Sequence, residues 1–144
     1  MITADNVHRD PAISKLFKKV TPIPIKSPEI NELSIIEIFH VDQFARFLKK
    51  LKVVKEPNGA SLLDSTMSLL GSGMSNANSH SNRDLPILLS GGGFKHGGHM
   101  HFARNGKQST PLCNLYLSML QNFGMDIDQF NTSSGTLTGL EKIT

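Results

Sequence analysis

Residues 89–102, LSGGGFKHGGHMHF, place five glycines and three histidines within fourteen positions. Histidine is a common metal ligand and proton carrier. His99 and His101 stand two residues apart, so a strand would direct both side chains to one face. There they could chelate a metal ion, with His96 as a third nitrogen ligand. The alternative is two exposed histidines beside a glycine turn, and spacing alone favours it because no carboxylate lies nearby in the sequence.

The glycines in this stretch permit two interpretations. Gly91, Gly92 and Gly93, with Lys95 supplying charge, could form a nest of backbone N–H groups that binds an anion. A structural turn between two strands explains the same residues equally well. The stretch is not followed by a helical pattern, as a dinucleotide-binding loop requires, and it lacks the Gly-Lys-Ser/Thr ending of a phosphate-binding P-loop.

A second group of candidate ligands lies in residues 72–84, SGMSNANSHSNRD, which are almost entirely loop-forming. Ligand sites in α/β sheets gather at the carboxyl ends of strands, and this segment follows a predicted strand. His80, Asn76 and Asn78 are therefore candidate site residues. A surface loop rich in turn-forming residues accounts for the same composition, and the sequence does not separate the two interpretations.

Composition narrows the classes of partner. The 144-residue chain has a formal net charge of +3, no tryptophan and one tyrosine. We expect no nucleic-acid partner, because such proteins present a clustered basic face with aromatic residues. The densest basic run is interpreted as a solvated helix face; it comprises Arg46, Lys49, Lys50, Lys52 and Lys55. Cys113 is the single cysteine, which excludes an internal disulfide and a zinc site built on several cysteines.

Targeting and membrane segments are also not expected. Residues 1–20 lack the apolar core of a signal peptide, and no apolar run has the length of a membrane span. The localisation is therefore left open.

Apolar periodicity predicts the elements that position these residues. A long helix is expected from Glu29 to about Val54, with Ser27 as its N-cap. Two apolar strands are expected at 65–71 and 85–90, and a third, half-exposed strand at 99–103. A second helix follows with Thr110 as N-cap, Pro111 in its first turn and Gly124 as its C-terminal stop. The tail after residue 125 is polar and is expected to wrap the surface.

This order of elements predicts an α/β fold with few strands flanked by helices and a sheet covered on both faces. Residues 1–28 are expected to be a weakly ordered lead-in, and 29–144 the C-terminal portion of an α/β domain. A fragment of a larger sheet should leave an apolar edge or face uncovered, and we therefore expect self-association through that surface.

Several stretches together resemble the C-terminal part of a bacterial family that is named for an HXXSHH motif and is a domain of unknown function. They are FHVDQFARFLKKL, LLDSTMSLLGSGMSNANSHSNRDLPILLSGGGF, GGHMHF, TPLCNLYLSML and SSGTLTGLE, from about Phe39 to Glu141. The resemblance implies a fold like that of the alkaline phosphatase and sulfatase superfamily, with metals at strand ends. Its members are around three times this length and are often exported.

The resemblance carries over only in part. The family loop has the form GSxMSDGNxHxxxDLP. Its matches here are Ser72, Met74, Ser75, Asn78, His80 and Asp84. Asn76 stands where aspartate is common, and the HXXSHH motif itself is absent. A divalent metal, if one binds, is expected on His80, His99 and Asn78. The glycines from Gly91 to Gly98 are interpreted mainly as positions where the backbone conformation requires glycine.

Two functions follow as expectations. The first is a truncated or partial family member that keeps one wall of a superfamily-type site and is inactive alone, with its catalytic residues unknown. The second is a non-catalytic module that binds an anion or a protein partner through the polar and glycine-rich loops.

Overall fold

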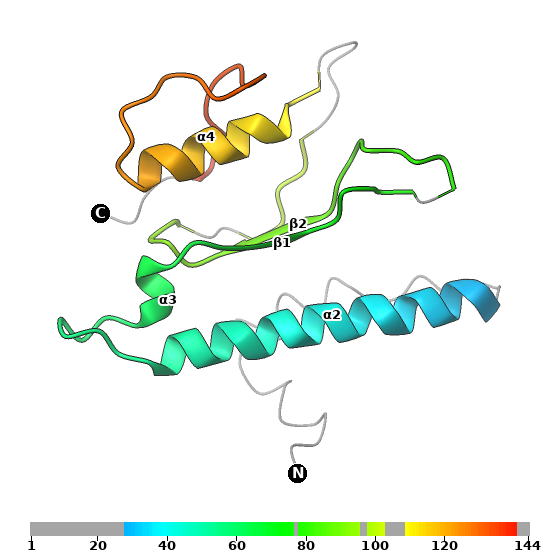
Figure 1. The fold of residues 1–144 in the computed structure, drawn as a ribbon, viewed down its shortest axis with the longest axis horizontal. Helices are drawn as coiled ribbons and strands as arrows, with labels where there is room; N and C mark the ends of the chain where they lie inside the picture. Colours follow the sequence, from blue (N-terminus) through cyan, green and yellow to red (C-terminus); the bar gives the residue numbers. More distant parts are fainter. Residues whose placement is uncertain (1–27, 77, 96–97, 103–108, 141–144) are drawn as a thin grey trace. The chain divides into compact units, whose positions relative to one another are not determined.

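The computed structural model describes residues 28–76, 78–95, 98–102 and 109–140, and side chains from Glu32 onward (Figure 1). The predicted cap Ser27, the lead-in and His96 lie outside the described residues. The chain divides into two compact units between Lys50 and Leu51, and the site described below lies in the second. None of the helices among the described residues combines the length and the apolar character that a membrane-spanning helix requires.

Helix α2, Pro28–Val53, matches the predicted long helix within one residue at each end. Arg46 and Asp42, four residues apart, form an ion pair at 2.7 Å. Such a pair adds only a few tenths of a kcal/mol to helix stability, about 0.3–0.5. Four of the five residues of the basic run are exposed, as expected of a solvated face, and Lys49 is half-buried.

The two predicted apolar segments are neighbouring strands. Strand β1, Ser68–Gly71, pairs antiparallel with β2, Ile87–Ser90, so that Leu69 faces Leu89 and Leu70 faces Leu88. Most residues of this pair are half-buried, so the described structure is a mixed fold of helices and a small antiparallel sheet, and the expected cover on both faces of the sheet stays a prediction. The described strands are joined by the polar loop 72–86 rather than by a crossover helix, and antiparallel pairing needs no helix.

Three predictions about boundaries need correction. The first strand begins at Ser68 because residues Leu62–Ser65 form a short helix, α3, that the apolar pattern did not reveal. Residues 99–102 of the expected third strand form no strand. Their alternating side chains fit a strand, but a strand also needs a neighbouring strand with which its backbone can form hydrogen bonds. Helix α4, Leu112–Asn122, has Pro111 rather than Thr110 as its N-cap residue.

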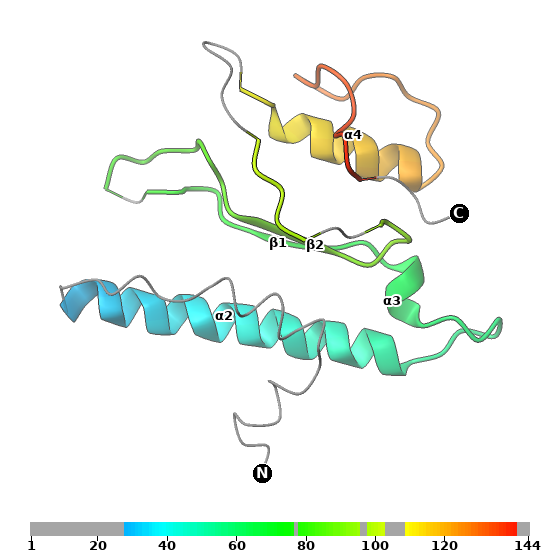
Figure 2. The same cartoon turned by 180° about the vertical axis from the view of Figure 1, so that it is seen from behind.

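The C-terminal end of α4 follows the prediction. Gly124 has a φ of +101°, a conformation that glycine adopts without steric cost. Its N–H donates to the carbonyl of Gln121, and the N–H of Met125 donates to that of Leu120. These two bonds define a Schellman motif. It turns the chain back along α4, as the reverse view shows (Figure 2).

Candidate functional site

The loop between β1 and β2 is organised by its own hydrogen bonds. The N–H of Ser75 donates to the carbonyl of Ser81 at 2.9 Å, and the N–H of Ser81 donates to that of Asn76 at 3.1 Å. The side-chain oxygen of Asn76 accepts the N–H of Ser79 at 3.1 Å. Asn76 therefore serves as a turn residue, using the carbonyl that would otherwise face a ligand.

His80 lies in this turn with a φ of +48° and an exposed side chain. Histidine is one of the few residues other than glycine that enter this region with any frequency. Asn78 is also exposed. The turn thus presents two of the three predicted metal ligands to solvent on a hydrogen-bonded loop.

The third predicted ligand, His99, is exposed and lies in an irregular segment after β2. Because 99–102 is not a strand, the argument that His99 and His101 share a strand face no longer applies. Among the described residues, no three His, Cys, Asp or Glu side chains are grouped so that they could hold a metal. The assignment of His80, Asn78 and His99 to one metal remains a prediction.

The glycine turn after β2 is shaped by close approach of the backbone. Gly91, Gly92 and Gly93 have φ values of +75°, +70° and +71°. A Cβ atom on Gly91 would collide with the carbonyl oxygens of Leu63 and Thr66. A Cβ atom on Gly92 would collide with the Met67 side chain. Glycine is therefore required at both positions by sterics as well as by φ.

Two polar groups of this turn are already used within the chain. The N–H of Gly92 donates to the carbonyl of Leu63 at 3.2 Å. The carbonyl of Gly92 accepts the side-chain amide of Asn122, the last residue of α4, at 2.6 Å. Lys95 is exposed beside the turn. An anion bound by Gly91–Gly93 would compete with α3 for the Gly92 N–H.

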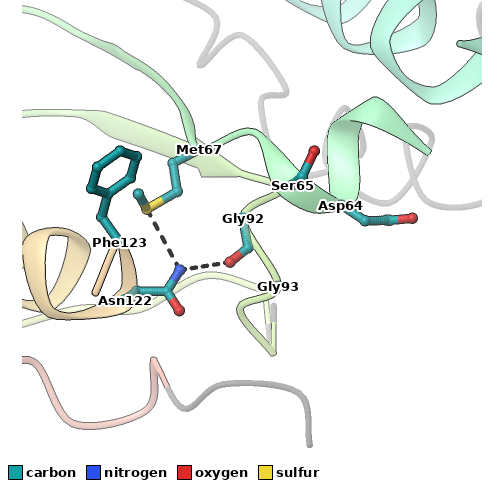
Figure 3. A pocket seen from close by; sticks show the side chains of 7 residues that line it. All are labelled: Asp64, Ser65, Met67, Gly92, Gly93, Asn122 and Phe123. Atoms are coloured by element: carbon teal, nitrogen blue, oxygen red, sulfur yellow. Dashed lines mark hydrogen bonds between the residues drawn. The ribbon is translucent and has the colours of Figure 1, made fainter. Parts of the chain in front are cut away.

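A cavity of about 300 Å³ lies where α3, the glycine turn and the end of α4 meet (Figure 3). It is lined by Asp64, Ser65, Met67, Gly92, Gly93, Asn122 and Phe123. The Asn122 amide nitrogen also approaches the Met67 sulfur at 3.6 Å. The Asn122 oxygen is buried without a hydrogen-bond partner in the described structure, and Figure 3 shows it turned away from Gly92 and Met67.

Asp64 is the single charged residue lining this cavity. Its carboxylate accepts the N–H of Ser61 at 2.9 Å. The hydrogen bonds from the Ser61 backbone and side chain lower the pKa of Asp64 below its ordinary value of 3.8, and Lys55 and Lys52 lower it further. Asp64 is thus held as a carboxylate that caps α3, and its environment is opposite to that of a proton donor.

The C-terminal segment lies along α4 and is bound through its backbone. The N–H of Ser134 donates to the Asn114 side chain at 2.9 Å. The N–H of Leu137 donates to the Ser118 hydroxyl at 2.9 Å, and that hydroxyl donates to the Asn114 carbonyl. Asn114 and Ser118 are buried. Next to this segment, Phe94, Asn122 and Leu137 are among the residues around a second cavity of about 470 Å³.

Sequence reasoning missed Asn114, Ser118 and Asn122, which it passed over within an apolar helix pattern. Their spacing of four residues was the available signal, because it places all three on one side of a helix.

A scan of family models finds no match to this chain. Searches of the curated proteins and of the solved structures also find no match.

Proposed function

We propose that this chain forms the C-terminal part of an alkaline-phosphatase-like domain of the HXXSHH family, contributes one wall of its site, and is not catalytic by itself. One observation carries the proposal. Two separate stretches that resemble the family, 110–120 and 133–141, are joined by hydrogen bonds. The Ser134 N–H donates to the Asn114 side chain, and the Leu137 N–H donates to the Ser118 hydroxyl. Buried polar groups paired in this way are typical of residues that specify a fold.

The glycine turn supports the same proposal. Gly91, Gly92 and Gly93 stand near the end of the segment 62–94 that resembles the family, and steric limits at the first two explain why glycine stands there. The candidate ligands, in contrast, are exposed and are not accompanied by a cluster of acidic residues in the described structure. A hydrolase site of this superfamily type needs several charged ligands around its metals.

The test is an assay of the purified chain with Zn²⁺, Mg²⁺ or Mn²⁺ against p-nitrophenyl phosphate and p-nitrophenyl sulfate. We expect no turnover above that of buffer with the same metal. Metal-dependent turnover that is lost in His80→Asn would contradict the proposal. Asparagine is the appropriate replacement because it tolerates the positive φ of His80.

The second candidate is a module that binds an anion or a protein partner, and the ordered turn that exposes His80 and Asn78 favours it. Titration of the ¹⁵N-labelled chain with phosphate and with sulfate separates the candidates. Saturable shifts of the Gly91–Gly93 or His80 amides would support binding, and shifts that grow linearly with salt would reject anion binding.

A further inference from the structure

Strand β1 carries no charged residue and no proline, two features that commonly keep another strand from pairing with an edge strand. Residues 65–82 contain no Asp, Glu, Lys or Arg, and β1 lies within them. In the described structure β1 pairs with one strand, β2. In an antiparallel pair, each strand directs part of its N–H and C=O groups away from its partner.

Strand β2 differs from β1 in this respect. Pro86 stands directly before Ile87 and has no N–H to donate, and the glycine turn ends extended backbone directly after Ser90. Before β1, in contrast, Thr66 is already extended, with φ −107° and ψ 118°. Strand β1 itself is extended from Ser68 to Gly71, and Thr66 is extended as well, although its N–H donates to the carbonyl of Leu63. Proteins normally protect strand edges with charges, prolines or bulges.

The side chains of this hairpin also retain exposed apolar surface. Leu69 and Leu70 are half-buried, as are Leu89 and Leu88, which face them across the pair. A two-stranded antiparallel pair is marginal by itself, and additional strands increase both its hydrogen bonding and its burial.

We propose that β1 pairs antiparallel with β1 of a second copy of this chain, giving a four-stranded sheet in the order β2–β1–β1–β2. A second copy is the fitting occupant because antiparallel pairing of identical strands is related by a two-fold axis and is self-complementary. The uncharged segment brings no like charges together across that axis. This proposal concerns the chain by itself, because in a larger α/β domain further strands could occupy the same edge, and it specifies where the expected self-association occurs.

Disulfide trapping tests the geometry. Facing residues in antiparallel strands have Cα atoms about 4.5–5.5 Å apart, within the range of about 4.4–6.8 Å that a disulfide spans. In a Cys113→Ser background, single cysteines are placed in turn in the proposed interface and in β2 as matched controls; the interface positions are Thr66, Met67, Leu69 and Leu70, and the controls are Leu88 and Leu89. We expect disulfide-linked dimers from one or two interface positions, several-fold above both controls. Equal yields from both strands, or none, would overturn the proposal.

Hydrogen exchange on the unaltered chain tests the same proposal without any substitution. We expect sedimentation equilibrium to show a dimer, and exchange at β1 amides to slow as protein concentration rises. A chain that stays monomeric with rapidly exchanging β1 amides would contradict the proposal. Slow exchange at β1 that does not vary with concentration would also overturn it, because the edge would then be covered within one chain.

Discussion

The side-chain amide of Asn122 donates a 2.6 Å hydrogen bond to the carbonyl oxygen of Gly92, thirty residues earlier in the chain. This contact fixes the end of α4 to the glycine turn that follows β2. Because Gly92 is buried, water cannot readily replace the amide as its partner, and loss of the donor leaves a desolvated carbonyl.

The loss of stability on replacing Asn122 should therefore depend on the side chain that is introduced. Asn122→Leu removes the donor and should lower the free energy of unfolding by about 1–3 kcal/mol. Asn122→Asp should cost more at neutral pH, since a carboxylate would face the Gly92 carbonyl. Burial beside that carbonyl raises the pKa of the introduced carboxyl, so the folded state binds the proton more tightly and this variant should gain stability as pH falls. Urea unfolding at several pH values measures both effects.

The glycine turn permits a graded test of sterics. Gly59, with a φ of +84° and no atom close to an added Cβ, is the matched control for Gly91 and Gly92. Gly59→Ala should cost about 1–2 kcal/mol from the left-handed backbone alone. Gly92→Ala should lower the free energy of unfolding further, because the new methyl group meets the Met67 side chain. Gly91→Ala should lower it most, because the carbonyl oxygens of Leu63 and Thr66 belong to the backbone and cannot move aside as a side chain can. Equal losses in thermal melts of the three variants would reject this account.

Asp64 should give a defined acid dependence. Its pKa is lowered in the folded state, chiefly by Ser61. Its contribution to stability is therefore complete above the ordinary value of 3.8 and is lost as pH falls through the lower folded value. The difference in melting temperature between the wild type and Asp64→Asn should shrink across that window. A constant difference would show that the carboxylate charge does not stabilise α3.

The C-terminal segment should loosen when its buried acceptors are removed. Asn114→Ala and Ser118→Ala should each cost about 1–2 kcal/mol and should speed hydrogen exchange at Ser134 and Leu137. Ser134→Ala is the control, because its N–H still reaches Asn114 and only a 3.3 Å contact to its hydroxyl is lost. Unchanged exchange at Leu137 in Ser118→Ala would contradict the assigned bond.

The predicted metal site is tested by calorimetry with Zn²⁺ on the wild type and on His80→Asn. If His80, Asn78 and His99 share a metal, the variant should bind at least about tenfold more weakly. Equal binding by the two proteins would reject His80 as a ligand. Absence of binding by both would reject the site.

The sequence by itself determined the elements that depend on local chemistry. Helices α2 and α4 follow from apolar spacing, the stop at Gly124 from the conformational freedom of glycine, and the two apolar strands from their composition. The tertiary structure decided whatever depends on partners distant in the chain: the antiparallel pairing of β1 with β2, the coil at His99, and the requirement for glycine at positions 91 and 92. It also decided which segments Asn114, Ser118 and Asn122 hold in place, because their hydrogen-bond partners lie nineteen to thirty residues away. No local pattern identifies such partners, because they are set by how the folded chain returns upon itself.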